Sequence, residues 1–144
     1  MPFVQVTAPK GTLNKKSRDE LMSRLSVAVI KAEGAEGKDP AALSLVWAYY
    51  NEIEHRASYV GGQSIENAPI VVEFATPQDA LTDETRNALV AETGVIFDDV
   101  FPLHENKPNH WALLREIDEG GWGGGGQIYG LAAIQNAMNI TVGV

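Results

Sequence analysis

The stretch Val6-Thr7-Ala8-Pro9-Lys10-Gly11-Thr12-Leu13-Asn14 recurs in altered form later in the chain, as Phe74-Ala75-Thr76-Pro77-Gln78-Asp79-Ala80-Leu81-Thr82. The two prolines are separated by 77 − 9 = 68 positions, and the two leucines share that offset. An arginine and a further leucine follow each stretch at matching distances. Similarity at a fixed offset is the signature of a duplicated structural unit. The chain therefore reads as two related halves.

A second group of matches lies downstream, with an offset of 111 − 47 = 64. It begins with Trp47 and Trp111 and ends with the Gly-Gly-Gln sequences at 61–63 and 125–127. A chain of 144 residues has the size of one domain. The predicted organisation is a single domain over 1–144, made of two pseudo-repeats and a C-terminal tail, at about 2–63, 70–127 and 128–144.

The first half predicts a strand, a helix and a second strand. Residues 3–7 are short and rich in β-forming side chains, and either Asn14 or Ser17 can cap the helix that follows. That helix carries apolar residues at i, i+4, i+7 and i+8, which predicts one buried face. Residues 43–53 are apolar on both sides, which is typical of a central strand.

The second half predicts the same order of elements. Its first strand covers 70–74, and its helix begins after Thr82 with two acidic residues in the first turn, where the helix dipole favours them. Its second strand covers His110–Ile117. The side chains expected on the buried side of this helix are Leu89, Val90, Ile96 and Phe97.

Two strand–helix–strand units side by side predict an α/β fold. Each unit is a right-handed crossover whose two strands run parallel. The expected product is a four-stranded sheet, parallel within each unit, with both helices on one face. The other face would carry Trp47, Tyr49, Trp111 and Leu113. A bare apolar surface of that size favours self-association, so we expect a homo-oligomer.

The composition excludes several classes of function. The formal net charge of −8 opposes binding to nucleic acid, which requires a basic surface. The chain has no cysteine, and its three histidines lack metal-ligand spacing. No segment approaches the roughly 18 apolar residues of a membrane span, and the N-terminus has no secretory pattern. We expect a cytoplasmic protein with no metal, nucleic-acid or membrane partner.

The N-terminus offers a candidate catalytic group. Removal of Met1 would expose the secondary amine of Pro2. An α-amino group titrates at roughly 7.7–8.0 when it is unperturbed, and burial or a nearby cation would lower that value. Such an amine can act as a general base or a nucleophile without histidine, cysteine or metal.

A fused pair of such units that starts with Met-Pro resembles the tautomerase superfamily, which includes 4-oxalocrotonate tautomerase and macrophage migration inhibitory factor. The most specific local element is the run from Arg115 to Gln127, REIDEGGWGGGGQ. It is similar to the family's strand-end glutamate, its glycine-flanked aromatic and its Gly-Gly pair. A weaker copy stands at 52–63.

The resemblance implies a cofactor-independent enzyme that forms homotrimers and uses Pro2 as its catalytic general base or acid. It also implies that Trp122 forms an aromatic wall over the proline, and that Lys38 contacts substrate. Trp111 is expected to extend the apolar wall, and Arg115, on the same side of its strand, is a candidate anion binder.

The chain departs from the family where anionic substrates are bound. The two arginines of the oxalocrotonate branch become Thr12 and Trp111 by position, and the water-activating glutamate of the dehalogenase branch falls near Gly124. A tautomerase acting on a small 2-keto acid or a phenylpyruvate-like enol is therefore expected. The alternatives are a hydratase, dehalogenase or decarboxylase using the same proline, and a non-catalytic trimeric binding protein.

Overall fold

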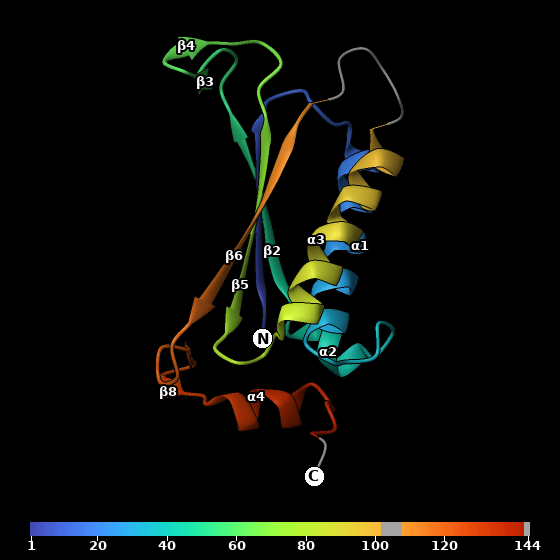
Figure 1. Cartoon of the computed structure of the whole chain (residues 1–144), viewed down its shortest axis with the longest axis vertical. Helices are drawn as coiled ribbons and strands as arrows, with labels where there is room; N and C mark the ends of the chain where they lie inside the picture. The colour runs from blue at the N-terminus through green and yellow to red at the C-terminus, as the bar shows by residue number, and fades with distance from the viewer. Residues whose placement is uncertain (102–107, 143–144) are drawn as a thin grey trace.

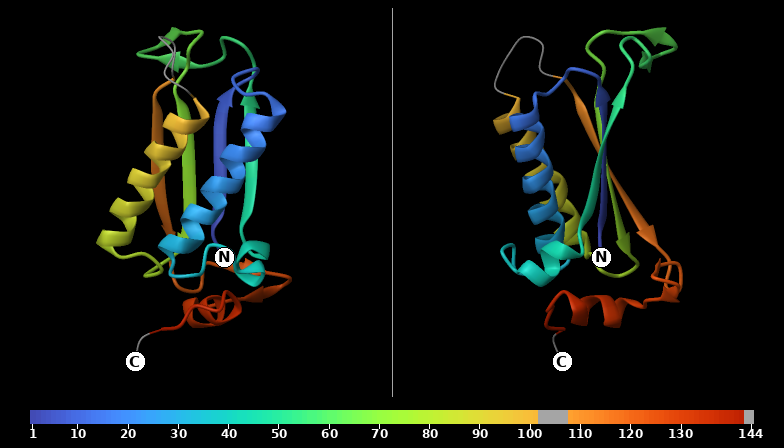
Figure 2. Two further views of the ribbon diagram at one scale, coloured as in Figure 1. Left: turned by 90° about the vertical axis from the view of Figure 1, so that its right-hand side faces the viewer. Right: turned by 180° about the vertical axis from the view of Figure 1, so that it is seen from behind.

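A computed structural model describes residues 1–101 and 108–142 (Figure 1). Four long strands form one sheet in the order β2-β1-β5-β6, and helices α1 and α3 cover one of its faces. The strands are β1 (Phe3–Pro9), β2 (Trp47–Ile53), β5 (Ile70–Pro77) and β6 (His110–Ile117), and the helices are α1 (Lys15–Ala32) and α3 (Asp83–Val100). The expected α/β fold with both long helices on one face is confirmed, and Figure 2 shows this layering from two further sides.

The sheet joins two strand–helix–strand units back to back. β1 runs parallel to β2, and β5 runs parallel to β6, as a crossover helix between paired strands requires. The two units meet where β1 and β5 pair in the antiparallel sense, with Gln5 opposite Glu73. The strands are therefore parallel within each unit, as expected.

Two expectations about the strand 43–53 are wrong. Residues Pro40–Ser44 form a short helix, α2, because Asp39 caps its first amides and proline fits the first helical position. β2 starts only at Trp47, and it lies at the edge of the sheet rather than at its centre. The apolar side chains on the outer side of β2 belong to the uncovered face of the sheet. They therefore do not indicate a strand that lies between two other strands.

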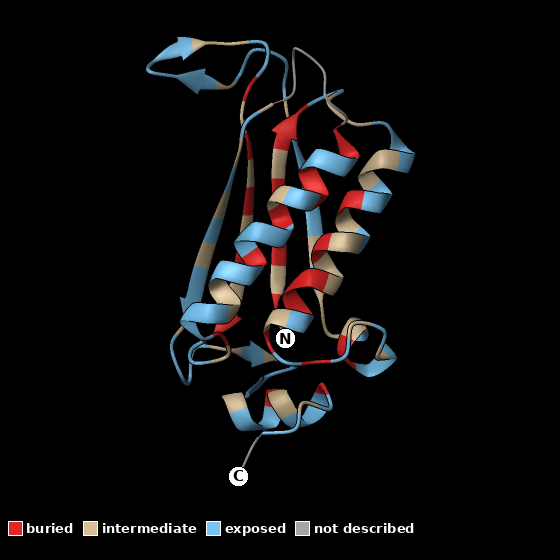
Figure 3. Cartoon of the chain, turned by 45° about the vertical axis from the view of Figure 1, so that its right-hand side comes forward, coloured by how far each residue is buried: buried red, intermediate tan, exposed pale blue. Residues whose placement is uncertain are grey.

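The core lies between the sheet and the two long helices. Alternate residues of the central strands point to the helices, since side chains alternate across a strand. Val4, Val6, Val72 and Phe74 are fully buried there, and burial of each such side chain contributes about 1.5–3 kcal/mol. Figure 3 shows the buried residues concentrated in the central strands and on the helix surfaces that meet them.

Both long helices begin at capping side chains in equivalent places. The Asn14 side chain accepts a hydrogen bond from the Ser17 amide at 2.8 Å, which decides between the two expected caps. Thr82 and Thr85 bond reciprocally in a capping box. On α3 the expectation for Val90 is wrong: it is 44% exposed, and Thr93 is buried instead, with its hydroxyl donating to a backbone carbonyl of the same helix.

Each half also ends in a small hairpin at the same offset of 64. The first joins β3 (Tyr59–Val60) to β4 (Gln63–Ser64), and the second joins β7 (Gly123–Gly124) to β8 (Gln127–Ile128). Both turns are Gly-Gly with positive φ at both positions, 58° and 81° in the first and 56° and 86° in the second. Type I′ turns require such angles, so these glycines fix the hairpins. The duplication itself stays an interpretation of this repeated pattern.

The C-terminal tail adds an element without a counterpart in the first half. Helix α4 (Leu131–Ala137) runs across the end of the sheet at which the N-terminus lies (Figures 1 and 2). The Glu119 carboxylate accepts from the Leu131 amide at 3.2 Å and holds the start of this helix. Ile134 and Met138 are buried and join the core. The tail therefore closes one end of the sheet.

The face of the sheet opposite the helices is uncovered. Its exposed side chains include Trp47 (67%), Tyr49 (59%), Trp111 (69%) and Leu113 (45%), as expected. None of the helices in the described ranges is long and apolar enough to cross a membrane.

Candidate functional site

A pocket of about 860 Å³ lies on the uncovered face, at the end of the sheet where the chain begins. Strand residues of one parity form its back wall, because successive side chains alternate between the two faces. These residues are Phe3, Gln5, Trp47, Glu73, Ala75, Arg115 and Ile117. The glycine-rich hairpin and helix α4 close the remaining sides, so three separate parts of the chain build the pocket.

The N-terminal residues form part of this lining. Pro2 is buried, and its carbonyl accepts a hydrogen bond from the Trp47 amide at 3.4 Å. The Met1 ammonium donates to the sulfur of Met138 at 3.3 Å. Burial lowers the pKa of this amine below its ordinary value, while the negative charge of Glu33 acts in the opposite direction. The local environment therefore favours a neutral amine at this end of the chain.

Trp122 forms a wall of the pocket between β6 and the hairpin. Its side chain is half-buried and packs against the core, and its carbonyl accepts from the Tyr129 amide at 2.9 Å. Gly121 before it is required by space: a Cβ there would lie 2.8 Å from Ile117 Cγ2 and 2.9 Å from the Asp118 carbonyl oxygen. The chain can therefore turn sharply after β6 and direct Trp122 to the pocket.

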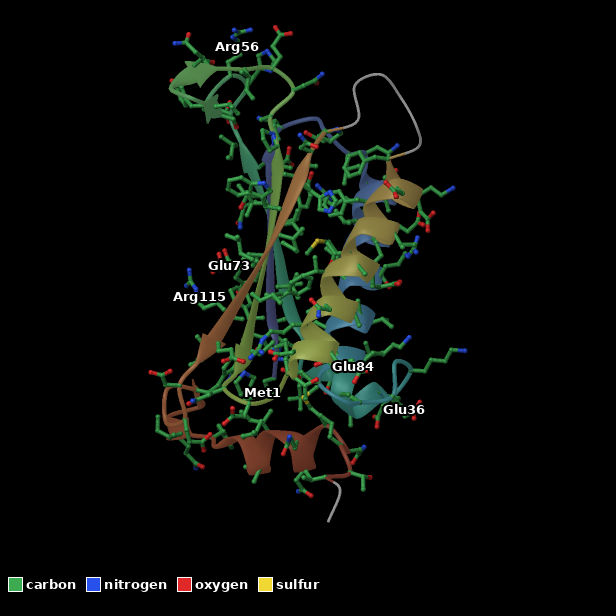
Figure 4. The ribbon with its side chains drawn as sticks, in the orientation of Figure 1. Met1, Glu36, Arg56, Glu73, Glu84 and Arg115 are labelled. Atoms are coloured by element: carbon green, nitrogen blue, oxygen red, sulfur yellow. The ribbon has the colours of Figure 1, made fainter. Side chains whose placement is uncertain are left out.

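One ion pair lies in the pocket. Arg115 Nη2 is 2.7 Å from Glu73 Oε1, and both side chains project from the same side of the sheet (Figure 4). Among the described residues that line the pocket, these two are the only charged side chains. Most of the rest is apolar, so the site combines a hydrophobic cavity, the chain terminus and a single neutralised cation.

The structure separates the five site residues expected from the sequence into two groups. Pro2, Trp122 and Arg115 line this one pocket. Lys38 is exposed in the connection between α1 and α2, away from the lining. Trp111 lies on the same face as Arg115, four residues before it on β6 since 115 − 111 = 4, and is 69% exposed outside the pocket. Their roles in binding stay predictions.

Sequence reasoning missed Glu33, the C-cap residue that follows α1. It is only 5% exposed, and within the described part of the chain neither carboxylate oxygen has a hydrogen-bond partner. Burial raises its pKa to about 7, and the nearby terminal amine opposes that shift. A signal existed, since Leu21, Leu25, Val29 and Glu33 follow one another at intervals of four, on the apolar stripe of the helix.

No family model matches the chain, and no curated protein matches its sequence. Solved structures match its fold. A fused 4-OT, described as a wild-type asymmetric trimer, has a TM-score of 0.71 and 21% identity, over 88% of this chain and 94% of that chain. Pt0534, described as inactivated by 2-oxo-3-pentynoate, has a TM-score of 0.65 and 22% identity, over 88% of this chain and 94% of that chain. Macrophage migration inhibitory factor of Toxoplasma gondii has a TM-score of 0.64 and 16% identity, over 88% of this chain and 99% of that chain. The chain therefore has the tautomerase fold.

Proposed function

We propose that this chain is an enzyme of the tautomerase superfamily that interconverts the keto and enol forms of a small 2-keto acid or a phenylpyruvate-like enol. One observation carries the proposal: buried Pro2 lines a largely apolar pocket together with Trp122. The shared fold supports it. The cavity volume of about 860 Å³ lies within the range of about 300–1,000 Å³ that is usual for small-molecule sites.

The proposed reaction uses the amine of Pro2 after Met1 has been removed. The neutral nitrogen takes a proton from the carbon next to the keto group, and the C–H electron pair becomes the C=C bond of an enolate. The protonated amine then returns the proton to the enolate oxygen, and the reverse sequence regenerates the ketone. A general base works best when its pKa lies near the working pH. Burial of the terminus, which already lowers the pKa of the Met1 amine, favours this.

The other lining residues would support this proton transfer without taking part in it covalently. Trp122 and the apolar strand residues exclude water, which strengthens electrostatic interactions inside the pocket. Arg115 is the one cationic side chain of the described lining and would stabilise negative charge that develops on the substrate oxygen. No metal or organic cofactor is needed for this sequence of steps.

We also propose that the chain assembles as a trimer. The uncovered face carries four large exposed apolar side chains, and a surface of that kind on a soluble protein marks an interaction site. Several of the fused 4-OT structures that share the fold are described as trimers. The pocket opens on this face, so a neighbouring copy would help to close it.

The experiment compares protein that keeps Met1 with protein that has lost it, each identified by intact mass. Both are incubated with a panel of enol and keto acids, alongside Pro2→Ala. Keto–enol turnover is expected only in the processed protein and is abolished in Pro2→Ala. The probe 2-oxo-3-pentynoate should attach once, at Pro2, in the processed form. Equal turnover with Met1 retained, or normal turnover in Pro2→Ala, would refute the proposal.

A further inference from the structure

We infer that Glu73 sets the charge selectivity of the pocket: by holding Arg115 it favours a substrate with one carboxylate and an apolar body over a dicarboxylate. The inference rests on the proposed function, because it concerns the substrate of the same pocket. It deepens that proposal by assigning the choice between substrates to a named residue outside the proton-transfer step.

The geometry places both charges where a bound anion would meet them together. Glu73 lies on β5, and Arg115 on β6 stands opposite Ala75, two residues along, so the 2.7 Å contact runs diagonally between adjacent strands. The Glu73 side chain is 25% exposed and that of Arg115 is 66% exposed. The guanidinium therefore keeps donors free toward the cavity while one of them is held by the carboxylate. An incoming anion meets a cation that is already neutralised.

The repeated architecture shows that the fold does not need these charges. At the offset of 68, Glu73 corresponds to Gln5, since 73 − 68 = 5. At the offset of 64, Arg115 corresponds to Asn51, since 115 − 64 = 51. In the first half the Asn51 side-chain amide donates to the Gln5 side-chain oxygen at 3.4 Å. The same backbone position thus holds a neutral amide pair in one half and an ion pair in the other.

A structural role is a weaker explanation for this difference. A partly exposed ion pair adds little to stability, and a neutral pair already serves the equivalent strands. Another repeated contact of the two halves keeps its charges: Arg18 pairs with Glu52 in the first, and Arg86 pairs with Glu116 in the second. Of these two repeated pairs, the one at Glu73 and Arg115 changes its chemistry between the halves.

The charge of Glu73 has unequal consequences for two kinds of ligand. A single carboxylate can use the remaining donors of Arg115, because the planar guanidinium presents five N–H groups. A second carboxylate finds no further cationic side chain among the described lining residues and is repelled by Glu73. At a separation of about 6 Å and an intermediate effective dielectric constant, that repulsion lowers affinity by about tenfold.

The test measures equilibrium binding of phenylpyruvate, with one carboxylate, and 2-oxoglutarate, with two, by calorimetry at low salt. The variants copy the first half: Glu73→Gln, Arg115→Asn and the double variant. The matched control is Glu66→Gln, which removes one negative charge from the ion pair with Arg56 (2.9 Å) at the far end of the molecule (Figure 4). Circular dichroism checks that each variant is folded.

The wild type is expected to bind phenylpyruvate more tightly than 2-oxoglutarate. Glu73→Gln should raise the affinity for both ligands, and the gain for 2-oxoglutarate should exceed that for phenylpyruvate by about tenfold, because its second carboxylate is also released from repulsion. Glu66→Gln should leave the ratio of the two affinities unchanged. Arg115→Asn and the double variant should weaken both ligands.

Equal effects of Glu73→Gln on the two ligands, the same gain from Glu66→Gln, or a wild type that prefers 2-oxoglutarate would overturn the inference. Binding is read without turnover. Loss of Pro2-dependent chemistry would therefore refute the proposed function and leave this selectivity measurable.

Discussion

Replacing Glu33 by glutamine should stabilise the protein at neutral pH and leave it nearly unchanged in acid. Glu33 is the C-cap residue of helix α1 and is 5% exposed, and neither of its carboxylate oxygens has a hydrogen-bond partner within the described residues. A buried carboxylate without a partner is costly in its charged form. Burial accordingly raises its pKa to about 7 from the ordinary 4.5, and the positive terminal amine only partly opposes this.

The sign of the effect follows from that raised pKa. A group with a higher pKa in the folded state binds its proton more tightly there, so folding is favoured while both states are protonated. This contribution is complete below pH 4.5 and is lost as the pH rises through about 7. The gap between the two values corresponds to about 3 kcal/mol of unfolding free energy. Glutamine does not titrate, so its advantage should grow from near zero below pH 4.5 to about 3 kcal/mol at pH 8.

Urea unfolding at pH 4, 5.5, 7 and 8 measures this difference, with intact mass confirming that Met1 is retained. The buried amide of glutamine adds a constant offset, so the quantity of interest is the change of the difference with pH. The control is Glu36→Gln, an exposed position three residues further on (Figure 4), which should give a flat difference. The reasoning would be refuted if the stability difference between Glu33→Gln and the wild type did not change with pH, or if the wild type became more stable relative to the variant as the pH rises.

Two further outcomes concern folding and assembly. Thr82→Ala removes the side-chain acceptor of the Thr85 amide (3.1 Å) and should lower the free energy of unfolding by about 1 kcal/mol. The midpoint of urea unfolding at constant m-value measures this loss, and an unchanged midpoint contradicts the capping argument. Trp111→Glu places a charge on the uncovered face, where Trp111 is 69% exposed, and should shift the sedimentation coefficient toward the monomer. Val95→Glu, on the exposed side of α3, should leave the assembly intact, and identical behaviour of the two variants would exclude the uncovered face as the interface.

The parts of the fold that could be predicted are those fixed by local chemistry. The caps Asn14 and Thr82 could be predicted because a short polar side chain directly before an amphipathic stretch can accept a hydrogen bond from the first free helix amides. His110–Ile117 was predicted with its observed bounds. The edge position of β2 was not readable, because an apolar strand looks the same whether its outer face meets a helix or an uncovered surface. The identity of strand neighbours depends on long-range pairing that periodicity does not encode.

The candidate site could be predicted only in part, for a related reason. The sequence pointed to Pro2, Trp122 and Arg115, which the structure places around one pocket, and to Lys38 and Trp111, which lie outside it. The partnership of Glu73 with Arg115 joins residues 42 positions apart, since 115 − 73 = 42. It depends on the register between β5 and β6. Helix α4 closes the pocket only because it folds back across the end of the sheet, which its sequence alone does not indicate.

A repeated backbone pattern need not contain a repeated site, and this chain shows why. The position equivalent to Pro2 is Ile70, which is fully buried and whose amide donates to the Asn109 carbonyl at 2.8 Å. An internal amide cannot serve as a base, so the second half lacks the amine whatever its shape. Ser58 stands where the second half has Trp122, and its hairpin is exposed rather than closed by a helix. The first half contributes the terminus and part of the back wall, and the second half contributes Trp122 and the ion pair. The two halves therefore supply different parts of a single pocket.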